Sequence, residues 1–275
     1  MCKIFSTFFP KRLDILTPMC YNSIVVRGTK VNPQHRKENN MKKIDKRKIY
    51  GIMLDTETAN TIVEEDGKIE MRFVLPYDIG FAVIDSKGNI YEKYSFVNDD
   101  IFCEEFALMQ SAYYVEKIPQ YIRDLANGKR QLKNTYEIRK ILCDLIQKYG
   151  CSFVVAHNSR FDYRALNNIQ RWTTKSKYRY FLPKEVEIWD TLKMARDVLL
   201  KMPTYIRFCE ENGYMTKHKT PQPQLTAEVI YRYITDNTDF EESHTGLEDV
   251  EIEVEIYKYL VKQHKKMRKK LFEEN

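Results

Sequence analysis

Two acidic residues, Asp55 and Glu57, end an apolar stretch in the segment GIMLDTETAN (residues 51–60). Residues two apart in an extended chain point to the same face, so both carboxylates would lie on one side of a strand. Carboxylate oxygens at that spacing suit a divalent cation, which prefers hard oxygen ligands. Taken alone, the pair also fits the ordinary polar end of a strand, and the two interpretations stay open at this point.

A second group of polar residues lies in VVAHNSRFDYRAL (residues 154–166). The apolar residues predict a buried strand, after which Asn158 stands in the connection and Asp162 in the first turn of a helix. Ser159 and Asp162 also have the spacing of a helix capping pattern. Asp162 is therefore either an acid that complements the helix N-terminus or a member of a site.

A third group lies in SHTGLEDVEIEVEI (residues 243–256). Thr245 and Glu248 have capping-box spacing, which predicts a helix that begins at about Gly246. The apolar residues after Asp249 also alternate as in a strand, but they satisfy the helical period, and we predict a well-buried helix. His244 then lies in the preceding loop, free to move, either as a functional group or as an ordinary surface histidine.

The elements that must position these groups follow from the apolar pattern. Segments 49–54, 77–85 and 89–97 are predicted strands, and residues 86–88 (SKG) form a turn between the last two. Strands at 152–158 and 185–190 then alternate with helices at 135–149, 160–172 and 191–200, whereas the stretch 101–135 is helical in pieces. We therefore predict an α/β fold in which helices flank a mixed sheet, an antiparallel meander plus parallel strands.

Charge divides the chain into a basic beginning and a slightly acidic remainder. Residues 1–50 contain 12 of the 45 Lys and Arg but 3 of the 39 Asp and Glu, so the net charge of +6 says little about the rest. We predict a basic, disordered extension over residues 1–48, one domain over residues 49–263 and a charged tail over residues 264–275.

Six scattered cysteines without a C-x-x-C pair predict reduced thiols and a cytoplasmic protein. No apolar run approaches the ~18 residues of a membrane-spanning helix. The sequence therefore predicts no membrane association.

The ordered set of D-x-E, H-N-x-x-F-D and H-x-x-x-x-D resembles the DEDDh (DnaQ-like) 3′–5′ exonucleases of the ribonuclease H-like superfamily. The proofreading subunit of bacterial replicative DNA polymerase belongs to this family. The resemblance covers roughly residues 49–263 and implies a ribonuclease H-like sheet.

The resemblance also implies a role for each matching residue. The four metal-binding acids would be Asp55, Glu57, Asp162 and Asp249, and they would hold two divalent cations, Mg²⁺ or Mn²⁺. His244 would be the general base. Thr56 would lie beside the nucleotide, while Asn158 and Phe161 would support the second motif.

About 80 residues separate the second and third motifs, and this interval contains the segment RWTTKSKYRYF (residues 171–181). Basic and aromatic residues together suit single-stranded nucleic acid, through phosphate pairing and base stacking. A solvated loop with aromatic residues tucked into the core would have the same composition. On the first interpretation, the substrate-binding candidates are Arg171, Trp172, Lys175 and Tyr178.

These expectations favour a metal-dependent 3′–5′ exonuclease that acts on single-stranded 3′ ends, with DNA preferred over RNA as substrate. A DNA polymerase or another replication protein is a candidate partner. An RNA-trimming exonuclease is the first alternative, because the same acids serve both substrates. A non-catalytic nucleic-acid-binding module of the same fold is the second.

Overall fold

The computed structural model describes residues 44–60, 62–63, 69–70 and 72–272. Residues 1–43 of the predicted extension and residues 273–275 of the predicted tail lie outside the described residues. Within the described part, a six-stranded sheet has the order β6-β5-β4-β1-β7-β8. The strands are β1 (Tyr50–Ala59), β4 (Leu75–Asp85), β5 (Ile90–Asn98), β6 (Gln131–Lys133), β7 (Phe153–Ala156) and β8 (Glu187–Asp190). A separate pair is formed by β2 (Ile62–Val63) and β3 (Ile69–Glu70).

The sheet is mixed, as the sequence predicts. The β1–β4 and β4–β5 pairs are antiparallel, whereas the β5–β6, β1–β7 and β7–β8 pairs are parallel. The predicted turn at residues 86–88 is present, and Gly88 adopts a φ of 80° there. β1 is longer than predicted, because its pairing with β4 continues to Ala59. Asp55 and Glu57 therefore lie inside the strand and not after its end.

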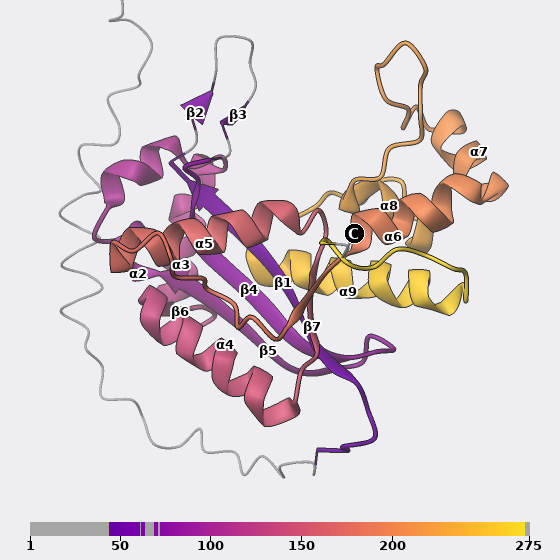
Figure 1. Ribbon diagram of the computed structural model, residues 1–275. Coiled ribbons are helices and arrows are strands. Elements are labelled where there is room, and N and C mark those ends of the chain that lie inside the picture. The colour runs from indigo at the N-terminus through magenta and orange to yellow at the C-terminus, as the bar shows by residue number, and fades with distance from the viewer. Residues whose placement is uncertain (1–43, 61, 64–68, 71, 273–275) are drawn as a thin grey trace, which may run out of the picture.

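Two helices cover one face of the sheet, α4 (Thr135–Tyr149) and α5 (Arg160–Thr174), and both lie in front of it in Figure 1. A capping box between Asn134 and Glu137 begins α4, and Gly150 ends it with a φ of 64°, as the sequence predicts. Buried side chains of α4 and α5 join Tyr50, Ile52 and Leu54 of β1 in one apolar core.

The opposite face is covered by α6 (Thr191–Val198), α8 (Ala227–Thr235) and α9 (Gly246–Lys262). Two further short helices, η4 (Leu199–Lys201) and α7 (Pro203–Glu211), follow α6. α9 lies behind the sheet in Figure 1, and the apolar residues at positions 250, 252, 254 and 256 are all buried. The helical interpretation of this segment is therefore confirmed.

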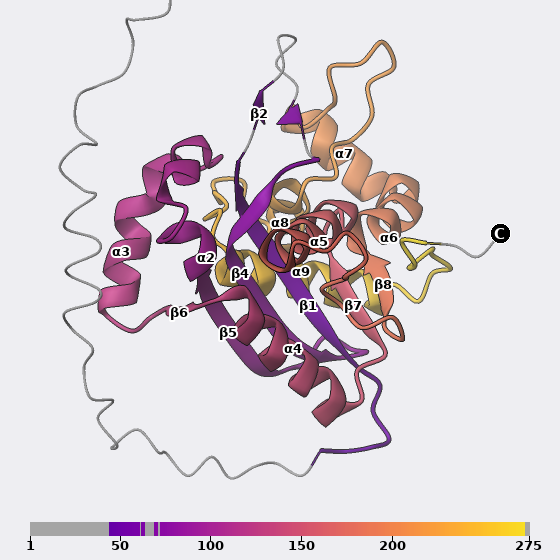
Figure 2. The same ribbon diagram turned by 60° about the vertical axis from the view of Figure 1, so that its left-hand side comes forward.

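The stretch between β5 and β6 forms α2 (Asp99–Phe102), η2 (Phe106–Ser111), η3 (Val115–Lys117) and α3 (Ile118–Ala126). Figure 2 shows this group of short helices at the end of the sheet where β4 begins and β5 ends. The predicted helical pieces are thus present. Their position brings Tyr113 and Tyr114 to the functional site described below.

The N-terminus of α9 is fixed against β4 by a buried polar network. One carboxylate oxygen of Asp78 accepts hydrogen bonds from the Gly246 amide (2.9 Å), the Tyr121 hydroxyl (2.7 Å) and the Arg130 guanidinium (3.1 Å). Arg130 also bonds to Glu248 in the first turn of α9 at 2.8 Å. An acid at a helix N-terminus is stabilising, so Asp78 sets where α9 begins.

Gly80 lets the two backbones touch at this point, and a side chain there should be disruptive. A Cβ atom on Gly80 would lie 2.2 Å from the carbonyl carbon of Gly246. We expect Gly80→Ala to lower the melting temperature and to displace Asp249. The activity should therefore fall even at temperatures at which the variant is still folded. Lys87→Ala, in the exposed turn that follows the same strand, should leave both thermal melting and activity unchanged.

Residues at the beginning of the predicted charged tail run along the outer edge of β8. The Asp190 amide donates to the Lys269 carbonyl at 2.8 Å, and the Leu271 amide donates to the Ile188 carbonyl at 2.7 Å. This part of the tail is therefore attached to the sheet. Among the helices of the described residues, none has the length and apolar character needed to cross a bilayer.

Candidate active site

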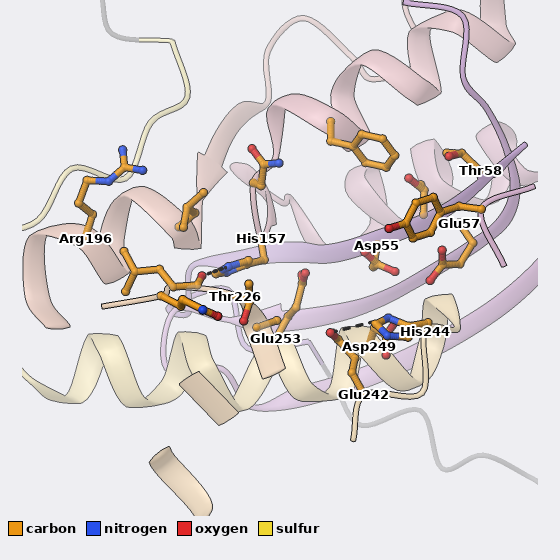
Figure 3. Close-up of a pocket in the computed structure, with 18 of the residues that line it drawn as sticks. Asp55, Glu57, Thr58, His157, Arg196, Thr226, Glu242, His244, Asp249 and Glu253 are labelled. Carbon is orange, nitrogen blue, oxygen red and sulfur yellow. Dashed lines mark hydrogen bonds and ion pairs between the residues drawn. The ribbon is translucent and has the colours of Figure 1, made fainter. Parts of the chain in front are cut away.

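The functional site forms where β1 extends past the end of β7. The parallel pairing of these strands stops at Met53 and Val155, so the following residues of β1 have an open side. Carboxylate oxygens of Asp55, Glu57 and Asp249 lie within 4.8 Å of one another there. The predicted meeting of the first and third motifs is therefore present, and Figure 3 shows these side chains converging on one cavity.

Asp162 reaches the same region from α5, on the other side of β1. Its carboxylate is buried and accepts a hydrogen bond from the Thr56 hydroxyl at 2.8 Å. The capping pattern predicted for Ser159 and Asp162 is not formed, because the Ser159 side chain makes no cap hydrogen bond. Thr56 thus links the second motif to the strand that carries the first, and Asp162 lies behind Thr56 without lining the cavity.

The acids share a strongly unfavourable electrostatic environment. Burial is the largest cause that raises the pKa of Asp55 well above its ordinary value, and the next largest is the carboxylate of Glu253. Burial likewise raises the pKa of Asp162 and of Asp249 to about 7. Like charges in a low-dielectric site repel, so this arrangement is costly when all the carboxylates are ionised.

The donor set fits a divalent cation. Asp55 Oδ2 is buried and has no hydrogen-bond partner among the described residues. Three carboxylates that offer oxygens at the observed spacing match the hard ligands that Mg²⁺ and Mn²⁺ prefer. A bound cation would remove the repulsion, because it would be the largest local charge.

The raised pKa values predict how stability depends on pH in the absence of metal. Asp162 and Asp249 titrate at about 7 in the folded protein against an ordinary 3.8, so the folded state binds more protons between these values. The free energy of unfolding should therefore fall as pH rises through this window. In EDTA, the melting temperature should be higher at acidic than at alkaline pH, and added Mg²⁺ should restore it at alkaline pH. The difference should shrink in Asp249→Asn, and equal melting of the wild type at both pH values would contradict this interpretation.

His244 faces the acids from the loop before α9. Its ligand-capable nitrogen lies within 4.8 Å of Glu242 and Asp249 oxygens, and its ring stacks on Tyr114 with centroids 4.4 Å apart at 11°. This stacking restrains the side chain, which the sequence predicted to be free to move. Burial, followed by the Lys117 charge, lowers the pKa of His244.

The helix start predicted from the capping box is confirmed, but the box is not formed. α9 begins at Gly246, yet Thr245 makes no side-chain cap bond to the backbone. Its hydroxyl instead donates to the Glu248 carboxylate at 2.8 Å, and Arg130 holds that carboxylate from the other side. Asp78 caps the helix in place of Thr245.

A pocket of about 970 Å³ opens from the acids. The predicted residues that line it are Asp55, Thr56, Glu57, Asn158, Phe161, His244 and Asp249. Arg171, Trp172, Lys175 and Tyr178 are not among its lining residues; they lie at and beyond the C-terminal end of α5. The structure thus brings the three motifs together and leaves the predicted basic and aromatic segment outside the pocket.

The pocket residues that the sequence analysis did not identify include Glu242, Glu253, Tyr114 and His157. Glu253 follows Asp249 by four residues, so helical spacing could have indicated it. His157 Nε2 donates to the Leu225 carbonyl at 2.7 Å, and Nδ1 lies 3.0 Å from the Thr191 hydroxyl, so both ring nitrogens are engaged. Because burial also lowers its pKa, His157 is a neutral structural residue.

No protein-family model and no curated protein matches the sequence. Among solved structures, the zinc-bound E. coli exonuclease I complex with single-stranded DNA is similar at a TM-score of 0.50 and 18% identity, over 79% of this chain and 41% of exonuclease I. A full-length 3′-exonuclease has a TM-score of 0.49 and 14% identity, over 82% of this chain and 88% of that one. The nuclease domain of 3′hExo, a DEDDh family member bound to rAMP, has a TM-score of 0.46 and 13% identity, over 82% of this chain and 100% of that one. The chain therefore shares the fold of the part of exonuclease I that it covers, a mixed sheet flanked by helices as the sequence predicts.

Proposed function

We propose that this protein is a metal-dependent 3′–5′ exonuclease that removes nucleotides from single-stranded DNA ends. The observation that carries the proposal is the convergence of Asp55, Glu57 and Asp249 beside His244 in an open pocket, with Asp162 directed to the same strand. Two divalent cations held by these acids would supply the charge that stabilises the attacking and the leaving oxygen of a phosphodiester during hydrolysis.

The residues of the chain would divide the remaining work. Asp55, Glu57 and Asp249 would hold one cation from a rigid strand and a buried helix, while Asp162 completes the acidic set. His244 would take the proton of the attacking water, since its lowered pKa leaves the imidazole neutral at physiological pH. Asn158 and Phe161 line the pocket beside Asp55 and would position the terminal nucleotides.

The test is a cleavage assay on labelled single-stranded DNA and RNA with Mg²⁺, with Mn²⁺ and with EDTA. We expect stepwise shortening of DNA from the 3′ end that requires metal. Faster cleavage of RNA would favour the exoribonuclease alternative. Binding without cleavage of either substrate would favour the non-catalytic module. A cytoplasmic location and a DNA polymerase or replication partner are parts of the proposal that rest on sequence alone.

The basic and aromatic segment beyond the pocket would bind the nucleic-acid strand upstream of its 3′ end. This segment contains three cation–π pairs. The distances from the cation to the ring centroid are 4.6 Å for Lys175 and Trp172, 5.2 Å for Lys177 and Tyr178, and 5.5 Å for Arg171 and Tyr180. The Tyr178 side chain is 79% exposed, so it is available for base stacking. Residues 163–184 contain six Lys and Arg and no acid, which suits a phosphate backbone.

This interpretation predicts an effect that depends on substrate length. α5 carries the chain from Phe161 at the pocket to Trp172 over roughly 16 Å, which is about five nucleotides at ~3.4 Å each, so a trinucleotide is too short to reach both. A Trp172→Ala/Tyr178→Ala variant should bind oligonucleotides of about 16 nucleotides about tenfold or more weakly, because stacking contributes ~1–3 kcal/mol per base. Cleavage of a trinucleotide should not change. Tyr136→Ala removes an equally exposed aromatic residue from α4 and should have no effect; a variant that binds long strands normally would refute this role.

A further inference from the structure

Glu253 is a buried acid that the three motifs do not include. It lies one helical turn after Asp249 on α9, is 4% exposed, and lines the pocket with the motif acids. Figure 3 shows its side chain rising from α9 toward the cavity between His157 and Asp249. Its Oε2 atom has no hydrogen-bond partner among the described residues.

The surroundings of Glu253 are acidic. After burial, the Asp162 carboxylate contributes most to raising the pKa of Glu253, and Glu253 contributes most, after burial, to raising that of Asp55. Within the described part of the chain, none of these three carboxylates forms an ion pair with Lys or Arg. The carboxylates of Asp55, Asp162 and Glu253 therefore repel one another without a compensating positive charge from the protein.

Such a group needs a partner. An ionised carboxylate buried without a counter-charge is strongly destabilising, so the group must gain either a cation or a proton. The oxygens of Asp55, Glu57 and Asp249 already form one set with cation-binding spacing. Asp55 Oδ2 is left without a partner and can serve a neighbouring cation, since two catalytic metals lie ~3.5–4 Å apart.

We propose that Glu253 is a fifth metal-binding acid and that it holds the second cation together with Asp55, before nucleic acid binds. The inference rests on the proposed two-cation site and extends it to a residue outside the motifs. A carboxylate from α9 gives the second cation a second protein ligand and lessens its dependence on substrate phosphates. The protein should then bind two cations in the absence of substrate.

The experiment is a titration of the full chain with Mn²⁺ alone. Calorimetry and electron paramagnetic resonance measure the binding. The wild type should bind two Mn²⁺, and Glu253→Gln should weaken one of the two sites by tenfold or more while the other is retained. Glu251→Gln is the matched control, because Glu251 lies on the same helix and pairs at the surface with Lys93. Glu253→Asp keeps the charge on a shorter side chain and should retain the weakened site in part.

The outcomes separate this inference from the proposed function. Unchanged two-site binding in Glu253→Gln, or a wild type that binds one Mn²⁺, overturns the role of Glu253 as a ligand. Two-site binding lost in Glu253→Gln supports it even if neither DNA nor RNA is cleaved, in which case the proposed function alone fails. If Glu253→Gln does not fold, Glu253→Asp decides: normal binding at both sites with normal melting in EDTA overturns the proposal, and selective weakening of one site supports it.

Discussion

An Asp55→Asn variant should lose about 10³-fold or more of the nuclease activity, because a shared cation ligand supports several kcal/mol of transition-state stabilisation. The variant should nonetheless fold. Asp55 lies in the central strand and is flanked by the carboxylates that raise its pKa, so removing its charge relieves repulsion in the metal-free protein. In EDTA at alkaline pH, its melting temperature should therefore equal or exceed that of the wild type.

Two comparisons make this prediction specific. Asp144→Asn changes an exposed acid on α4 that pairs with Lys140, and it should leave cleavage unchanged. Mg²⁺ should raise the melting temperature of the wild type and of Asp144→Asn more than that of Asp55→Asn. Retention of most of the activity by Asp55→Asn, or full wild-type activity in EDTA, would remove Asp55 from the metal site.

Much of the fold could be predicted because the sheet is built from long apolar runs. β1 and β4 are buried on both faces along nearly their whole length, and their composition shows this directly. The end of β1 could not be predicted from local composition. The strand continues through its polar residues to Ala59 because β4 supplies partners there, and that pairing is a long-range contact.

The site was predictable in part for a related reason. Each motif lies within a strand, follows a strand or begins a helix, so its place along the chain is evident even though its neighbours in space are not. Tyr114 and Glu242 reach His244 from loops whose paths depend on tertiary packing. Asp78 likewise caps α9 from a distant strand, and no local pattern around Thr245 reveals this.

His244 decides whether this site carries a histidine general base or only a cluster of metal-binding acids. Because the imidazole would act on the attacking water, His244→Ala should lower kcat by about 10²–10⁴-fold with little change in KM. Mn²⁺ binding should be retained at both sites, since His244 is not part of the set formed by Asp55, Glu57 and Asp249. His218→Ala replaces an exposed histidine in another loop and should leave kcat unchanged.

The pH profile provides a second readout for His244. The ring is surrounded by Glu242, Asp249 and Lys117, with Glu116 and Glu228 also acting on it, and burial is the largest cause that lowers its pKa below 6.5. A base with a lowered pKa is neutral and active at pH 7. The wild-type rate should therefore fall as the pH drops below the pKa of His244. The acidic limb should be absent from the residual activity of His244→Ala.

Two results would assign His244 a different role. Its position beside Glu242 and Asp249 is also the geometry of a metal ligand, since the three groups offer atoms within 4.8 Å of one another. If His244→Ala loses Mn²⁺ affinity and thermal stability together, the residue is a ligand or a structural group. If kcat is nearly normal and the acidic limb persists, the cations alone activate the water. A large loss of kcat with intact metal binding and a missing limb would leave proton transfer as the role that accounts for all three observations.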